Sequence, residues 1–253
     1  MTRFFLLPIL ILILHTSAYG LEVTFQPIAD VDEPIVRLGD IVRFDKESAV
    51  AKSLASQIVS NAPAPGEDMF LQSGRVLQQL NRHLSSLPSN TLWNGVSTIK
   101  VHRKGNKIDS DRIASIIADY IDTHKDSLPE ADIRFLPASL PMPFILPTGR
   151  LTTEVIPSDP QILGSSRFSI IFRVDGDVVK NMSVRGRLEA ISTIVVAAEQ
   201  LHRGTILQSQ HLTIAQQDIS ELKGFSASPD QIIGKKLSRT LRAGSPLLDA
   251  ILT

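Results

Sequence analysis

Histidines are the first residues to consider for chemistry, because imidazole is the commonest catalytic base and a frequent metal ligand. The chain holds six, at positions 15, 83, 102, 124, 202 and 211. None has the His-x₃-His or His-Glu-x-x-His spacing that places two imidazoles around one metal ion. His202 and His211 flank one expected strand pair, but two histidines without a nearby third ligand are more often loop residues. We therefore expect no metal site.

Other catalytic patterns are missing as well. Gly164-Ser165-Ser166 lacks the second glycine of a nucleophile elbow, and no glycine-rich phosphate loop is present. The absence of cysteine excludes thiolate catalysis, thiolate metal sites and disulfides. A formal net charge of zero argues against general nucleic-acid binding. We expect no catalytic residues and no cofactor, hence a binding or assembly protein, although carboxylates distant in sequence could still meet in an enzyme's cleft.

Positive charge is concentrated at one place, which makes these residues candidates for binding a partner: Lys235, Lys236, Arg239 and Arg242. If this segment is a strand, Lys235 and Arg239 alternate outward and form a stripe on one face. The alternative is a solvated strand face that binds nothing.

The segment around this cluster, residues 194–253, contains a short internal repeat. The apolar, β-branched run 193–198 predicts a buried strand. Two copies of Leu-x-x-Gly-(Ser/Thr)-x-Leu follow, at residues 201–207 and 241–247. We expect Gly204 and Gly244 to make turns that require positive φ. The repeat predicts a small, pseudo-symmetric β module.

The first twenty residues have the features of a secretory signal peptide. Arg3 precedes an apolar run over residues 4–14, and small residues at Ala18 and Gly20 predict cleavage between Gly20 and Leu21. The run is shorter than the roughly 20 residues that a membrane span requires. An uncleaved N-terminal anchor is the alternative. We expect an exported protein with no stable membrane span after cleavage.

Between these ends, the chain is expected to be α+β and mostly β. Residues 21–136 predict an α/β domain with a strand at 96–103 and an amphipathic helix at 109–124 capped by Asp109 or Ser110. Prolines at 137, 141, 143 and 147 predict a linker or boundary over residues 137–149. Residues 150–193 predict a β-rich segment, with Asp175-Gly176 as a hairpin turn.

Taken together, these motifs carry a resemblance to a known family. The strand at 194–198, the two glycine turns and the segment Ile232-Ile233-Gly234-Lys235-Lys236-Leu237 resemble an SAF domain, a β-clip module. With the signal peptide, Leu38-Gly39-Asp40-Ile41, residues 146–151 and the hairpin, the chain is similar to the flagellar basal-body P-ring assembly chaperones. That resemblance implies a non-enzymatic protein of the Gram-negative periplasm with a hinge between its halves. It would bind the P-ring subunit and assist its assembly around the rod within the peptidoglycan layer.

Two other functions fit the same motifs, and the sequence differs from the family at one point. An exported pilus-assembly protein would also carry an SAF module, and a cell-wall sugar-binding protein or enzyme is the more distant alternative. Family members continue past the second glycine turn, whereas this sequence stops at Thr253. We therefore expect either a short member or a fragment. If nothing replaces the missing strands, an apolar edge at residues 194–196 or 247–252 would be uncovered.

Overall fold

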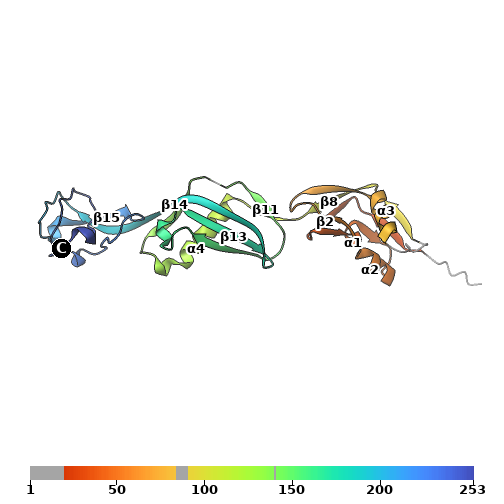
Figure 1. Cartoon of the computed structure of the whole chain (residues 1–253), viewed down its shortest axis with the longest axis horizontal. Coiled ribbons are helices and arrows are strands. Elements are labelled where there is room, and N and C mark those ends of the chain that lie inside the picture. Colours follow the sequence, from red (N-terminus) through yellow and green to blue (C-terminus); the bar gives the residue numbers. More distant parts are fainter. Residues whose placement is uncertain (1–19, 84–90, 140) are drawn as a thin grey trace, which may run out of the picture. The chain divides into compact units, whose positions relative to one another are not determined.

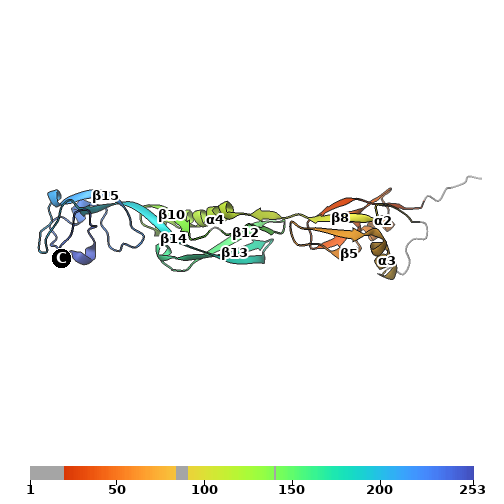
Figure 2. The same cartoon turned by 90° about the horizontal axis from the view of Figure 1, so that it is seen from above.

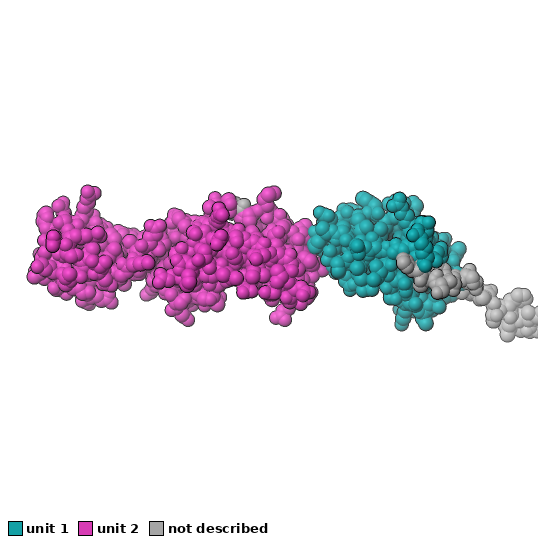
Figure 3. Space-filling model, in the orientation of Figure 1, with its two compact units in different colours: residues 1–104 teal, residues 105–253 magenta. Residues whose placement is uncertain are grey.

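The computed structural model describes residues 20–83, 91–139 and 141–253, which form two compact units within Met1–Lys104 and Gly105–Thr253 (Figure 3). Most of the predicted signal peptide lies outside the described residues. Leu21, which follows the predicted cleavage point, is 7% exposed, and its carbonyl accepts a hydrogen bond from Leu92. Over the described ranges, no helix has the length and apolarity needed to cross a membrane.

Unit 1 is built from short strands paired in three sheets (Figure 1). β1 (Glu22–Phe25) pairs with β4 (Val42–Phe44) and, in parallel, with β7 (Leu92–Gly95). β8 (Thr98–Arg103) lies between β2 (Ile28–Val31) and β6 (Asp68–Gln72). β3 (Ile35–Arg37) pairs with β5 (Ile58–Asn61). Alternate residues of β1, β2 and β8 are buried, as the polar and apolar alternation of their sequences requires.

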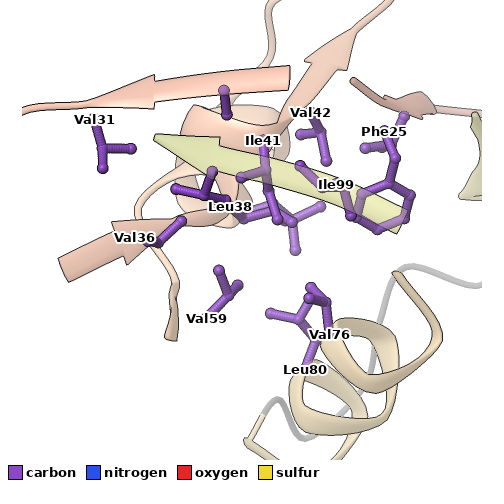
Figure 4. Close-up of a cluster of buried hydrophobic side chains, with 14 of the residues drawn as sticks. Phe25, Val31, Val36, Leu38, Ile41, Val42, Val59, Val76, Leu80 and Ile99 are labelled. Carbon is purple, nitrogen blue, oxygen red and sulfur yellow. The ribbon is translucent and has the colours of Figure 1, made fainter. Parts of the chain in front are cut away.

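Helices α1 (Leu38–Ile41), α2 (Ala49–Ala55) and α3 (Ser73–His83) complete unit 1. Gly39 and Asp40 lie within a single helical turn, which buries Leu38 and Ile41 completely (Figure 4). Asp40 accepts a hydrogen bond from the Arg37 backbone N–H at 2.7 Å and so closes the start of this turn. A Cβ on Gly39 would lie 3.0 Å from the Ala55 Cβ, so glycine lets α2 approach.

Unit 2 opens with β9 (Asn106–Ile108) and α4 (Ser110–Thr123). Its main sheet has the order β10 (Asp132–Pro137), β14 (Asp177–Ala197), β13 (Arg167–Val174) and β12 (Leu151–Pro157). β15 (Leu212–Asp218) also pairs with β14, and β11 (Phe144–Leu146) pairs with β9. Short 3₁₀ helices lie at Lys125–Ser127, Ile162–Gly164, Ser209–His211, Pro229–Gln231 and Asp249–Ile251.

One core joins α4 to this sheet. The predicted amphipathic helix is α4, whose apolar stripe is buried with Phe168 and Phe172 of β13: Ile113, Ile116, Ile117 and Ile121. Phe135 of β10 packs edge-on against Phe168. The Asp109 side chain caps α4 by accepting from the Arg112 N–H at 3.0 Å, as predicted. Because α4 and β10 share their core with β12–β14, the units divide at Lys104–Gly105 and not at the expected boundary, residues 137–149.

β14 is a single strand of 21 residues that runs from the main sheet into the C-terminal module (Figure 2). It begins at the expected hairpin, where Asp175 and Gly176 have φ of 53° and 96°. Residues 177–185 pair with β13, residues 186–191 with β10 and residues 191–197 with β15. Gly186 permits the change of partner, because a Cβ there would overlap the Leu136 carbonyl oxygen of β10. The sequence pattern suggested separate short strands; one continuous strand connects the central sheet to the C-terminal module.

Candidate partner-binding surface of the C-terminal module

The C-terminal module has its own apolar core, formed by nine buried residues: Val195, Ala197, Leu201, Leu207, Ile232, Leu237, Leu241, Leu247 and Ile251. The expected uncovered apolar edge at residues 194–196 or 247–252 is wrong. Ile194, Val195 and Val196 are at most 1% exposed, and Leu247 is fully buried. Bridges from Phe225 to Leu248 and from Leu237 to Leu252 hold the last residues against the core.

The two glycine turns are related by a pseudo-twofold axis that lies between Leu201 and Leu241. These leucines exchange backbone hydrogen bonds at 2.9 and 2.8 Å. The Gly204 N–H donates to the Leu237 carbonyl at 2.8 Å, and the Gly244 N–H donates to the Ala197 carbonyl at the same distance. Adding or subtracting forty residue numbers converts one bond into the other. The predicted pseudo-symmetry is therefore real.

Further bonds obey the same relation. Leu207 donates to the Lys235 carbonyl at 2.9 Å, as Leu247 does to Val195 at 3.1 Å. Gly204 and Gly244 have φ of 88° and 77°, so both adopt the positive values predicted for them. We call residues 201–207 with 235–241 the Gly204 turn, and residues 241–247 with 195–201 the Gly244 turn.

The four predicted partner-binding cations are all exposed, but they do not form a stripe on one strand. The predicted strand is wrong, because residues 235–242 make only isolated bridges at Lys236, Leu237 and Leu241. Lys235, Lys236 and Arg239 belong to the Gly204 turn, whereas Arg242 lies on the Gly244 turn. Pairing of the two segments adds Arg203, whose N–H donates to the Thr240 hydroxyl at 3.2 Å. Sequence reasoning missed Arg203, although it stands inside the first glycine motif.

A second feature of this surface is the outer edge of β15. Ala198 donates to the His211 carbonyl and Ile219 donates to the Ala190 carbonyl, which fixes the register of hydrogen bonding between β15 and β14. In an antiparallel ladder hydrogen-bonded pairs alternate, so Thr213, Ala215 and Gln217 face β14. The backbone groups of Leu212, Ile214 and Gln216 consequently point away from it. Over the described residues, no other strand pairs with β15.

A cleft of about 560 Å³ lies beside the end of β15, lined by Ser165, Arg187, Asp218 and neighbouring residues. Asp218 accepts from the Ala190 and Ser220 N–H groups, both at 3.0 Å, and pairs with Arg187 at 3.4 Å. Burial alone would raise the pKa of Asp218. The N–H donors together with the Arg187 charge outweigh it, so the pKa falls below the usual 3.8. An ionised, fully bonded carboxylate here fixes the junction of β14 and β15.

The histidines of the module are not gathered for metal binding. The His211 Nδ1 accepts from the Gln208 N–H at 3.2 Å, which closes the 3₁₀ turn before β15. In the part of the chain that the structure describes, no three His, Asp or Glu side chains are placed to hold a metal ion.

Residues 192–252 match the family model of the SAF domain. The C-terminal module is thus similar to the SAF domain over nearly its whole length. This confirms the resemblance drawn from the glycine turns, and the match includes β15 and both turns. No curated protein sequence matches the chain.

Several solved structures resemble the chain at low sequence identity. The flagellar protein FlgA from Thermotoga maritima MSB8 is 14% identical, with 92% of this chain and 78% of that chain covered and a TM-score of 0.36. Salmonella FlgA in its closed form is 15% identical, over 55% of this chain and 68% of that chain, with a TM-score of 0.36. The open form is 14% identical, over 56% and 63%, with a TM-score of 0.38.

Proposed function

We propose that the protein is a periplasmic chaperone that assists assembly of the flagellar P ring by binding the ring subunit through its SAF domain. Two findings support this proposal. The SAF family match covers the C-terminal module. The upstream motifs Leu38–Ile41, residues 146–151 and the Asp175-Gly176 hairpin resemble the P-ring assembly chaperones. The same proposal includes export through the N-terminal signal with cleavage before Leu21. It also places the assisted ring assembly within the peptidoglycan layer.

The open edge of β15 is the observation that carries the binding step. An edge strand presents unpaired N–H and C=O groups that can accept a strand from another protein. Leu212, Ile214 and Gln216 present theirs outward, and Ile214 is 56% exposed. A ring subunit that adds one strand here would have its own assembly edge covered until it reaches the rod. That is the action expected of an assembly chaperone.

β15 is better suited to strand addition than the other open edges of this sheet. Proteins protect exposed edges with charges, prolines and bulges. β10 carries Asp132 and Arg134 and ends at Pro137, and β12 carries Glu154 and ends at Pro157. β15 has neither charge nor proline from Leu212 to Gln217, and its register with β14 contains no bulge.

The test is a proline that blocks the edge without breaking the ladder. Ile214→Pro removes an N–H that points away from β14, so the domain should fold while strand addition is blocked. Thr153→Pro on β12 is the matched control. The hydrogen bonds at Arg150 and Ser158 set a register in which the N–H of Thr153 also points away from the neighbouring strand, β13. Binding to the purified P-ring subunit would be measured by titration calorimetry.

We expect Ile214→Pro to weaken binding at least about tenfold, since several main-chain hydrogen bonds depend on this edge. Thr153→Pro should bind as the wild type does. Equal binding by all three proteins would refute strand addition at β15. Failure of the wild-type protein to bind the subunit, with capture of a pilus component from the periplasm instead, would favour the pilus-assembly alternative.

A further inference from the structure

The pseudo-symmetry of the SAF domain is broken by charge. The Gly204 turn carries four cations, Arg203, Lys235, Lys236 and Arg239, and no carboxylate. The Gly244 turn carries one of each, Arg242 and Glu199. At the equivalent positions, Ala243 replaces Arg203, Val196 replaces Lys236 and Glu199 replaces Arg239. The two turns therefore share one backbone geometry, but the Gly204 turn is strongly positive and the Gly244 turn has no net charge.

The cations are not needed to form the turn. The Gly244 turn makes the same backbone hydrogen bonds and buries the same leucine positions without them. No ion pair with a carboxylate of the described residues neutralises any of the four. Their mutual repulsion therefore opposes the folded state, and a bound anionic surface would relieve it.

The side chains gather around the Gly204 turn itself. A Cβ on Gly204 would lie 3.7 Å from the Lys236 Cε, so the Lys236 stem runs across the turn next to Arg203. Arg239 lies between Lys236, which is bridged to Ile206, and Leu241, which is bridged to Leu201, and this register places it opposite Arg203. Ile206 is bridged to Lys236 and is 59% exposed, which places an uncovered apolar side chain among the cations.

We propose that the Gly204 turn is a docking surface for an acidic patch on a protein partner, with Ile206 as its apolar contact. Arginine combined with an exposed aliphatic side chain is typical of protein interfaces, whereas an anionic lipid or polysaccharide requires charge alone. This inference rests on the proposed function for the partner's identity, the ring subunit. It adds a second contact at a turn that the β15 edge does not include.

The experiment compares two triple variants with the same change in net charge. Arg203→Gln, Lys236→Gln and Arg239→Gln remove three charges from the Gly204 turn. Gln200→Glu, Lys223→Gln and Ala243→Glu make an equal change elsewhere on the domain, at exposed residues. Both should fold as the wild type does, because the changes are at the surface, and the first should melt no lower than the wild type, because it relieves repulsion between like charges. Binding to the purified ring subunit is measured at low and high salt, together with sedimentation with phosphatidylglycerol vesicles.

We expect the first variant to bind the subunit about ten to a hundred times more weakly at low salt, with a smaller salt dependence, and the second to bind like the wild type. Equal weakening in both variants would refute a site at the Gly204 turn and leave the proposed function standing. Vesicle binding that only the first variant loses, with unchanged subunit binding, would assign the turn to lipid and overturn the proposal.

If the wild-type protein does not bind the ring subunit, the proposed function fails and the inference is decided in living cells. A photoreactive residue at position 206 should then give a cross-link to one protein, which mass spectrometry identifies, and the first triple variant should abolish it while the second retains it. No cross-link, or one that both variants retain, would overturn the docking surface.

Discussion

Adjacent prolines on β15 should destabilise the protein to very different extents, and this difference tests the hydrogen-bonding register that leaves the outer edge of β15 open. Thr213 faces β14, and its N–H is directed at the carbonyl of Val196, which is 1% exposed. Thr213→Pro would leave that buried carbonyl without a donor and push the ring against β14. The expected loss is about 2–4 kcal/mol in the free energy of unfolding. Ile214→Pro loses only an N–H directed to solvent, at a cost of about 1 kcal/mol or less.

Thermal unfolding, monitored by circular dichroism, distinguishes the two variants. For a unit of this size each kcal/mol corresponds to roughly 2–4 °C, so Thr213→Pro should melt on the order of 10 °C lower and Ile214→Pro at most about 4 °C lower. A reversed order would mean that the N–H of Ile214 and not that of Thr213 faces β14, and equal losses would contradict the assigned register. The edge proposed to bind the ring subunit would then be assigned to the wrong residues.

Two further predictions concern stability alone. Gly95→Ala should destabilise unit 1 far more than Gly176→Ala destabilises unit 2 in urea titrations: φ is positive at both, but a Cβ on Gly95 would overlap the Phe25 backbone, whereas Gly176 has open space around it. Equal losses would contradict that close approach. The folded pKa of Asp218 lies below its unfolded value of about 4, so the stability from its ionised side chain is present above about pH 4 and is lost as the pH falls further, through the folded pKa. The advantage of the wild type over Asp218→Asn in the free energy of unfolding should therefore shrink below about pH 4, and a constant advantage down to about pH 2 would refute the assignment.

Local patterns predicted the elements whose determinants lie close together in sequence. The Ile113–Ile121 stripe with its Asp109 cap gave α4, and Asp175-Gly176 gave the hairpin, because capping and turn geometry depend on a few adjacent residues. The glycine turns were likewise predictable, since positive φ at Gly204 and Gly244 follows from their motif.

Features set by pairing between distant segments were not predictable. The proline-rich passage suggested a boundary, yet β11 within it pairs with β9 and contributes Leu146 to the central core. Composition alone could not reveal that pairing. The basic cluster was predicted by its sequence proximity, but the pseudo-twofold axis brings Arg203 to it and moves Arg242 to the other turn.

The most direct test of the proposed function is electron microscopy of basal bodies isolated from cells that lack this protein. If it is the P-ring assembly chaperone, the rods should lack P rings, and a wild-type copy of the gene should restore them. Complete P rings and normal swimming without the protein would contradict the proposal.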